Sequence, residues 1–292
     1  MSDSKIIKLR CGGVPEHFNL PWRLAQENQV INDIELSWKD FGGGTGQMCE
    51  ALRNDEIDLA ILLTEGALKD ISNGNPSKIV SHYVTSPLKW GVHTGSSSPI
   101  NVGDEILNPV FAISRYTSGS HLMAYLYAQK LGVELTAESF SVIQNLQGAA
   151  VSLTANPDQL FLWEKFTTQP MVDSGVFKRL DIYPTPWPPF VVVVSNSWLR
   201  KHGDLIQKVI SEVLGIANEF INQRNKAAII SERYNLELSE SQEWLSEVEW
   251  ARTTHLDYSV FKKVKNALLE MGEMDADYRV TEALFNSYFE KA

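Results

Sequence analysis

Short apolar runs alternate with stretches of helical hydrophobic spacing through the first two thirds of the chain, and this alternation predicts an α/β fold. Residues 57–63 and 190–194 are apolar almost throughout, as strands covered on both faces are. Strands are predicted at 6–11, 34–38, 57–63, 78–84, 88–93, 110–114, 139–143, 159–163 and 190–194, and residues 177–182 are expected to close the second unit. Helices are predicted at 18–28, 47–54, 120–131 and 146–154, with a short one after Thr64-Glu65-Gly66 and a helical stretch at 164–174.

From Ser197 onward the pattern is almost entirely helical. Apolar residues at three-to-four spacing between Leu205 and Ile221 predict one long amphipathic helix. Further helices are expected near 226–234, 239–248, 258–271 and 279–291. We expect this helical region to pack on the first domain.

Two strand-to-helix turns are rich in glycine and hydroxyl residues. One is Phe41-Gly42-Gly43-Gly44-Thr45-Gly46-Gln47, and the other is Ser114-Arg115-Tyr116-Thr117-Ser118-Gly119-Ser120-His121, with hydroxyl residues where a helix N-cap belongs. A helix that opens on small residues leaves its first backbone N–H groups free and carries the positive end of its dipole. Such an end suits a carboxylate, a sulfonate or a phosphate. A plain tight connection is the alternative for the glycine turn.

Composition and charge exclude several classes of partner. With 292 residues, 43% of them hydrophobic and 21% charged, the chain can form two ordinary domains. The net charge of −10 argues against nucleic acid and anionic membranes, while local N–H groups still allow a small anion. No apolar run is long enough to span a membrane. The polar N-terminus lacks the features of a secretory signal, so we expect a cytoplasmic location, or a periplasmic one if a signal peptide has been removed.

Neither turn fits a known cofactor or metal motif. The glycine turn lacks the third glycine of the dinucleotide pattern and the Gly-Lys-Ser/Thr of a P-loop. The histidines and cysteines show no metal spacing, and Cys11 and Cys49 are expected to be free buried thiols. We therefore predict no metal and no cofactor. Ser118 and His121 are better explained as a helix cap than as a nucleophile and its base, so no catalytic residue is predicted.

Four motifs in their order along the chain resemble the type II periplasmic-binding-protein fold. They are residues 41–46, 63–66 and 113–121, followed by Phe161-Leu162-Trp163-Glu164-Lys165-Phe166. Within that fold the sequence is similar to the nitrate, sulfonate and taurine binding proteins of importers and to the thiamine pyrimidine precursor proteins, as a cytosolic member without a signal peptide.

The resemblance implies an α/β protein of two lobes that hold a small molecule in the cleft between them. Lobe 1 would comprise residues 1–90 and 190–292, with the C-terminal helices packed on it, and lobe 2 residues 91–189. Two crossover strands, near 88–93 and 190–194, would join the lobes, and closure about them would bury the ligand.

Residues that would line the cleft follow the motifs of the resemblance. From the first lobe they are Asn19, Gly44, Thr45, Gly46, Gln47, Thr64 and Glu65, and from the second Thr117, Ser118, His121, Trp163 and Glu164. Side-chain chemistry adds Arg115, which can complement an anion, and Trp187, which can stack on a flat ligand. Alternatives stay open: a surface ion pair for Arg115, a salt bridge between the lobes for Glu65 instead of a ligand amine, and core packing for the two tryptophans.

The predicted function is to bind a polar metabolite, anionic or zwitterionic. One rival is an enzyme on the same fold, related to thiamine pyrimidine precursor synthesis, although a binding role is favoured over catalysis. The other rival is a regulatory or transporter-linked subunit. Its protein partner, or a second copy of the chain, would dock on the C-terminal helices at 204–292.

Overall fold

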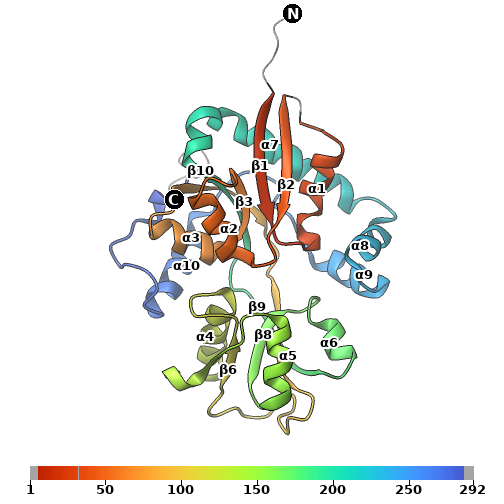
Figure 1. The fold of residues 1–292 in the computed structure, drawn as a ribbon, viewed down its shortest axis with the longest axis vertical. Helices are drawn as coiled ribbons and strands as arrows, with labels where there is room; N and C mark the ends of the chain where they lie inside the picture. The colour runs from red at the N-terminus through yellow and green to blue at the C-terminus, as the bar shows by residue number, and fades with distance from the viewer. Residues whose placement is uncertain (1–5, 32, 286–292) are drawn as a thin grey trace, which may run out of the picture. The chain divides into compact units, whose positions relative to one another are not determined.

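Two separate sheets form the framework of the computed structural model, which describes residues 6–31 and 33–285 (Figure 1). Within the described residues each sheet has five strands, flanked by helices. The chain divides into two compact units. Unit 1 comprises Met1–Ser86 and Trp187–Ala292, and unit 2 comprises Pro87–Pro186.

The sheet of unit 1 has the strand order β2-β1-β3-β10-β4. Its strands are β1 (Ile7–Gly13), β2 (Ile34–Asp40), β3 (Leu59–Leu63), β4 (Ser77–Val84) and β10 (Phe190–Ser195). Strand β1 runs parallel to β2 and β3, whereas β10 runs antiparallel to β3 and β4. The carboxyl ends of β1 to β4 and the beginning of β10 therefore lie at one edge of the sheet, which we call edge 1.

The predicted apolar run of β10 is confirmed as a central strand. Its four valines, residues 191–194, are completely buried between β3 and β4. Strands β3 and β4 flank β10 within the sheet, and its valines are buried on both faces of the sheet. A strand in that position carries apolar side chains on both faces.

Helices surround the sheet of unit 1 and include the long C-terminal helical region. They are the short 3-10 helix η1 (His17–Asn19), α1 (Leu20–Glu27), α2 (Gly44–Arg53), α3 (Thr64–Ser72), α7 (Asn196–Ile221), α8 (Lys226–Tyr234), α9 (Leu238–Glu247), α10 (Tyr258–Glu270) and the 3-10 helix η3 (Val280–Glu282). Helix α7 packs on α1, β4 and β10, and α10 packs on α3. The helical region therefore belongs to unit 1, as its apolar spacing predicts.

Three helix boundaries differ from the predicted ones. Helix α2 begins at Gly44 rather than at Gln47, because the Gln47 side chain turns back and accepts a hydrogen bond from the Gly43 amide. Of the stretch predicted as helical at 164–174, only α6 (Gln169–Asp173) is a helix, since Glu164 pairs with Trp90 as the last residue of a strand. Near the C-terminus only η3 forms within the described residues, and 286–292 lie outside them.

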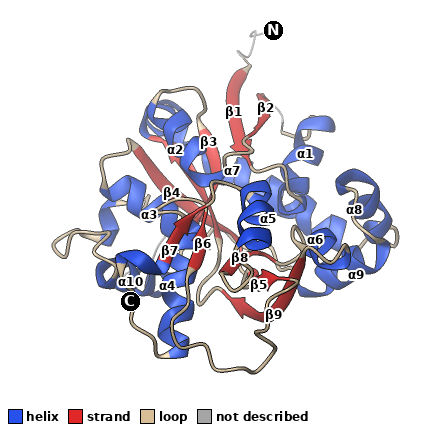
Figure 2. Cartoon of the chain, turned by 60° about the horizontal axis from the view of Figure 1, so that its bottom comes forward, coloured by secondary structure: helices blue, strands red, loops and turns tan. Residues whose placement is uncertain are grey.

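The sheet of unit 2 has the order β7-β6-β8-β5-β9. Its elements are β5 (Lys89–Gly95), β6 (Phe111–Ile113), α4 (Gly119–Leu131), the 3-10 helix η2 (Ala137–Ser139), β7 (Phe140–Val142), α5 (Leu146–Ala155), β8 (Leu160–Glu164), α6 and β9 (Phe177–Pro184). Strand β6 is parallel to β7 and β8, and β5 is antiparallel to β8 and β9, beside which it lies in Figure 2. The carboxyl ends of β6 to β9 and the beginning of β5 thus share one edge, which we call edge 2.

Candidate functional site

The glycine turn forms the first turn of α2 at edge 1. The Gly44 amide donates to the Phe41 carbonyl (3.0 Å) and Gly44 has a φ of +68°, a left-handed conformation that suits glycine. The amides of Thr45 and Gly46 lie within this first turn, where a helix offers no carbonyl four residues back. Gly46 is exposed. Edge 1 therefore presents backbone N–H donors at the positive end of a helix.

Thr45 joins the beginning of α2 to the beginning of α3. Its hydroxyl oxygen accepts a hydrogen bond from the Leu63 amide (3.3 Å). A Cβ atom at Gly66 would lie 2.6 Å from the Thr45 methyl carbon, so only glycine allows this approach. The first turns of the two helices are therefore in direct contact.

The first two residues of α3 both bond to the segment that precedes β10. The Thr64 hydroxyl donates to the Pro188 carbonyl (2.6 Å), and the Thr64 amide donates to the Pro189 carbonyl (2.8 Å). The Glu65 carboxylate accepts a hydrogen bond from the Trp187 indole N–H (3.1 Å). Burial raises the pKa of Glu65 above its ordinary value.

Asn19 lies at the same edge, in the connection between β1 and α1. It precedes α1 but makes no capping hydrogen bond with its side chain. Its amide nitrogen donates instead to the Val14 carbonyl (2.9 Å). The side-chain oxygen is buried and has no hydrogen-bond partner among the residues that the structure describes.

Edge 2 carries the hydroxyl-rich turn before α4. Ser118 caps this helix: its hydroxyl oxygen accepts from the His121 amide (3.3 Å) while its hydroxyl donates to the Arg115 carbonyl (2.7 Å). Thr117 has a φ of +67°, and its amide donates to His121 Nδ1 (3.1 Å). Nδ1 therefore accepts, which leaves the proton of a neutral ring on Nε2. The cap that the sequence predicts is confirmed in detail.

Ser114 and Ser120 extend this turn into a cluster of hydroxyl groups, and sequence reasoning did not select either residue. The Ser120 hydroxyl oxygen accepts from the Ser114 amide (2.9 Å) and lies within hydrogen-bond distance of the hydroxyls of Ser114 (3.1 Å) and Ser118 (3.0 Å). The signal was present in the motif, because both serines belong to it. Arg115 is exposed beside the cluster.

Trp163 and Glu164 end β8 at edge 2 and are engaged within unit 2. The Trp163 ring stacks on Phe161 with 5.5 Å between ring centroids and packs against the core of the unit. One oxygen of Glu164 accepts from both the amide (2.6 Å) and the hydroxyl (2.8 Å) of Thr167. Burial raises the pKa of Glu164 as well.

A buried network supports the turn after β8. The Arg179 guanidinium donates to the Lys165 carbonyl (2.8 Å), the Gln169 side chain (2.7 Å) and His93 Nε2 (3.3 Å). Burial lowers the pKa of His93 to about 3, so the ring is neutral and Nε2 can accept. Sequence reasoning missed this network because its members lie on separate elements: β5, the turn after β8, α6 and β9.

The predicted site residues thus fall into two groups, one at the carboxyl-end edge of each sheet. Edge 1 collects Asn19, Gly44, Thr45, Gly46, Gln47, Thr64, Glu65 and Trp187. Edge 2 collects Arg115, Thr117, Ser118, His121, Trp163 and Glu164. Open α/β sheets place their ligands at such edges.

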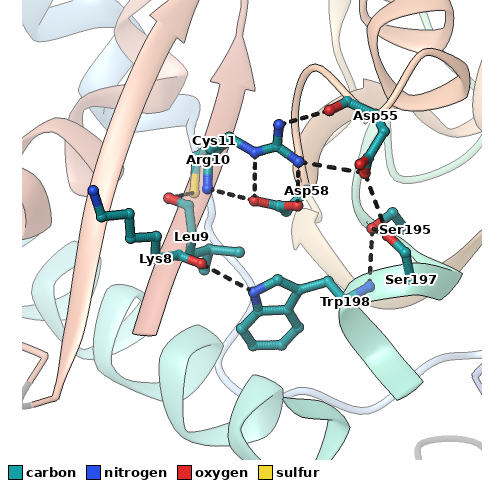
Figure 3. Close-up of polar contacts among 9 residues, drawn as sticks. All are labelled: Lys8, Leu9, Arg10, Cys11, Asp55, Asp58, Ser195, Ser197 and Trp198. Atoms are coloured by element: carbon teal, nitrogen blue, oxygen red, sulfur yellow. Dashed lines mark hydrogen bonds and ion pairs between the residues drawn. The ribbon is translucent and has the colours of Figure 1, made fainter. Parts of the chain in front are cut away.

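A cavity of about 480 Å³ lies at the opposite edge of the unit 1 sheet. Arg10, Asp55 and Asp58, three of the charged residues that line it, are paired with one another (Figure 3). Arg10 donates two side-chain hydrogen bonds to Asp58 (2.8 and 2.9 Å) and one to the Asp55 carbonyl (2.6 Å). The Trp198 indole donates to the Lys8 carbonyl (3.3 Å). These contacts tie β1 to the segment before β3 and to α7, which is a structural role.

A smaller cavity of about 290 Å³ adjoins the connection after β1. Two arginines line it, and both are paired: Arg233 with Glu27 (2.6 and 2.9 Å), and Arg23 with Asp40. Neither arginine is therefore free to act as an anion receptor.

Residues 6–31 and 33–285 contain neither a group of metal ligands nor a helix suited to span a membrane. No three side chains of His, Cys, Asp or Glu are grouped there so that they could hold a metal ion. None of the helices there is both long and apolar enough to cross a membrane.

Comparison with known proteins gives one matching family and several similar solved structures. The family described as Ca3427-like PBP matches residues 90–182. The solved structure of the Candida albicans CA3427 gene product shares 28% identity with a TM-score of 0.83, covering 97% of this chain and 96% of that one. No curated protein matches this chain.

More distant structures share the fold. The alkanesulfonate-binding protein SsuA of Xanthomonas axonopodis pv. citri, bound to MOPS, is 15% identical with a TM-score of 0.78, covering 95% of this chain and 98% of that one. The periplasmic nitrate-binding protein NrtA of Synechocystis PCC 6803 is 12% identical with a TM-score of 0.70, covering 98% and 86%.

Proposed function

Because the chain belongs to the type II periplasmic-binding-protein-like family, we propose that it binds a polar small molecule that carries an acidic group. The observation that carries this proposal is the pair of helix starts, α2 at edge 1 and α4 at edge 2. Each begins at the carboxyl end of a parallel strand and opens on glycine and hydroxyl residues. Sulfonate and nitrate, which the more distant relatives bind, are both oxyanions.

The chemistry of the two helix starts favours an oxyanion. At edge 1 the Thr45 and Gly46 amides are donors that need an acceptor, and the α2 dipole adds about 0.3–1 kcal/mol for a negative charge at an exposed helix end. A hydrogen bond to a charged group contributes about 1.5–3 kcal/mol. Two or three such bonds contribute about 3–9 kcal/mol, from which the cost of immobilising the ligand is subtracted.

Several finer expectations stay predictions. They are the position of the ligand between the units and closure on it, the cytoplasmic location, the relation to thiamine precursors, and a partner or second copy docked on the C-terminal helices. The two helix starts support the ligand chemistry.

The experiment that tests the proposal removes a single N–H donor. Gly46→Pro takes away the amide at the third position of α2, and proline is compatible with the first turn of a helix, as Pro21 near the start of α1 illustrates. We expect ethanesulfonate, propionate or nitrate, titrated by calorimetry, to bind Gly46→Pro about tenfold or more weakly than the unaltered chain.

Gly46→Ala is the matched comparison, because it changes the same residue but keeps the amide. Its affinity should fall far less than that of Gly46→Pro. Equal loss in both variants would show that the N–H group is not the ligand contact. No binding of any of these anions by the unaltered chain would overturn the proposal.

A further inference from the structure

Edge 1 contains a buried carboxylate without a cation. Glu65 is only 4% exposed. The Trp187 indole N–H and the residue's own backbone are its donors, and among residues 6–31 and 33–285 no lysine, arginine or histidine pairs with it. A buried charge is costly unless a partner compensates it.

The other buried acids of the described chain are satisfied, which makes Glu65 the exception among them. Asp58 is held by the Arg10 guanidinium. Glu164 receives two hydrogen bonds from Thr167 on one oxygen. Among the residues that the structure describes, Glu65 has neither a cation nor a second side-chain donor, so its carboxylate can accept further hydrogen bonds from a ligand.

Asn19 provides a second acceptor of the same kind at edge 1. Its side chain is 2% exposed, the amide nitrogen is used by the Val14 carbonyl, and the oxygen has no partner in the described residues. Asn19 follows β1 and Glu65 follows β3, and these two strands are paired neighbours. Within the described residues, the Asn19 oxygen and the Glu65 carboxylate at edge 1 can thus each accept a further hydrogen bond from a ligand.

The donors for an acidic group lie beside these acceptors. Thr45, in the first turn of α2, bonds to the Leu63 amide and packs on Gly66, the residue after Glu65. The N–H end of α2 and the Glu65 carboxylate therefore belong to adjoining helix turns. Edge 1 combines a place for a negative group with acceptors for a positive one.

From this arrangement we propose that the ligand carries a protonated amine in addition to its acid group, and that the ammonium donates to Glu65 and Asn19. Trp187 acts as the positioning residue that holds the Glu65 carboxylate through its indole N–H. This inference rests on the proposed function, since it specifies the ligand class of the same site. The proposed ligand differs from that of the nitrate-binding relative, because nitrate has no ammonium group.

Matched ligand pairs test the inference directly. β-Alanine and propionate, and 3-aminopropanesulfonate and propanesulfonate, each differ only in the ammonium group. We expect calorimetric titration of the full chain to give at least tenfold tighter binding for the amino member of one of these pairs. In Glu65→Gln that preference should shrink to threefold or less, while affinity for the partner without the amine does not fall, because a negative charge near its acid group is removed.

Two further variants separate this role from a general effect of charge or folding. Glu35→Gln removes the same charge from an exposed position on β2 and should keep the full preference. Trp187→Phe keeps the ring but loses the indole donor; it should reduce the preference for the amine without weakening binding of the partner that lacks it.

Different binding results would overturn this inference and the proposed function. Equal affinity for both members of every pair, or a preference that survives in Glu65→Gln, overturns the ammonium assignment and leaves oxyanion binding intact. Absence of binding for every compound overturns both.

Discussion

At the scale of single residues, the surroundings decide what a buried acid does. One oxygen of Glu164 accepts two hydrogen bonds from Thr167, and Arg10 pairs with Asp58, so both carboxylates have partners within the fold. Within residues 6–31 and 33–285, Glu65 has the Trp187 indole as its only side-chain donor. The same residue type is therefore structural in one place and a candidate ligand contact in another.

Glu65 should destabilise the ligand-free protein at neutral pH. Burial raises its folded-state pKa above the ordinary value of 4.5, so the folded state loses stability as pH rises through that raised pKa. We expect Glu65→Gln to raise the free energy of unfolding by about 1–3 kcal/mol at pH 7. This gain in the free energy of unfolding should vanish below pH 4.5, where Glu65 is protonated in both the folded and the unfolded state.

Urea unfolding of the two proteins at pH 7 and pH 4 measures this difference. A loss of stability in Glu65→Gln at pH 7 would mean that the carboxylate has a compensating partner. That result would also remove the reason for assigning it a ligand ammonium.

At the scale of elements, the beginnings of α2 and α4 are formed in different ways. Helix α4 is capped by the hydroxyl of Ser118, which directly precedes it. Helix α2 is capped by a residue within the helix, because the Gln47 side-chain oxygen accepts a hydrogen bond from the Gly43 amide. Both solutions leave first-turn amides available at the edge of a sheet.

Ser118→Ala should lower stability and ligand affinity together. Loss of a serine cap costs about 1 kcal/mol of folding stability, and it also releases the turn that positions His121. Ser195→Ala is the matched control, because Ser195 caps α7 in the same way by accepting from the Trp198 amide (3.3 Å) at the opposite edge of unit 1.

Both variants should lose similar stability in thermal unfolding, and only Ser118→Ala should bind the ligand more weakly, by about threefold or more. Equal ligand affinity in the two variants would contradict a role for the α4 turn in binding.

The sequence predicts those features that depend on neighbouring residues. The α4 cap could be read directly, because the capping hydroxyl stands beside the helix and apolar periodicity continues after it. The start of α2 lies at Gly44, three residues before the start that the pattern predicts, since a glutamine side chain that folds back leaves no periodic signal. The bond from Trp187 to Glu65 spans 122 residues along the chain, so only the fold reveals it.

At the scale of the whole molecule, each unit repeats one plan: parallel strands end at one edge, and helix starts gather there. Apolar runs and turn motifs were sufficient to predict this plan. The opposite edge of unit 1 serves stability, where Arg10 links β1 to Asp55 and Asp58 (Figure 3). The proposed ligand site and this stabilising network thus occupy different edges of the same sheet.

Arg10→Met should weaken the fold without changing ligand binding. It leaves Asp58 buried and uncompensated, which costs about 2–4 kcal/mol of unfolding free energy. Chemical denaturation measures the loss, and calorimetry at a temperature where the variant is folded measures affinity. A large loss of affinity in the folded variant would assign the cavity beside Arg10 to binding.

Native mass spectrometry of the purified chain, incubated with the matched acids and amino acids, tests the central claim most directly. The account predicts an added mass of one small molecule that bears both an acid and an amine, strongly reduced in Gly46→Pro. No added mass from any compound at millimolar concentration, with the unaltered protein folded, would contradict it.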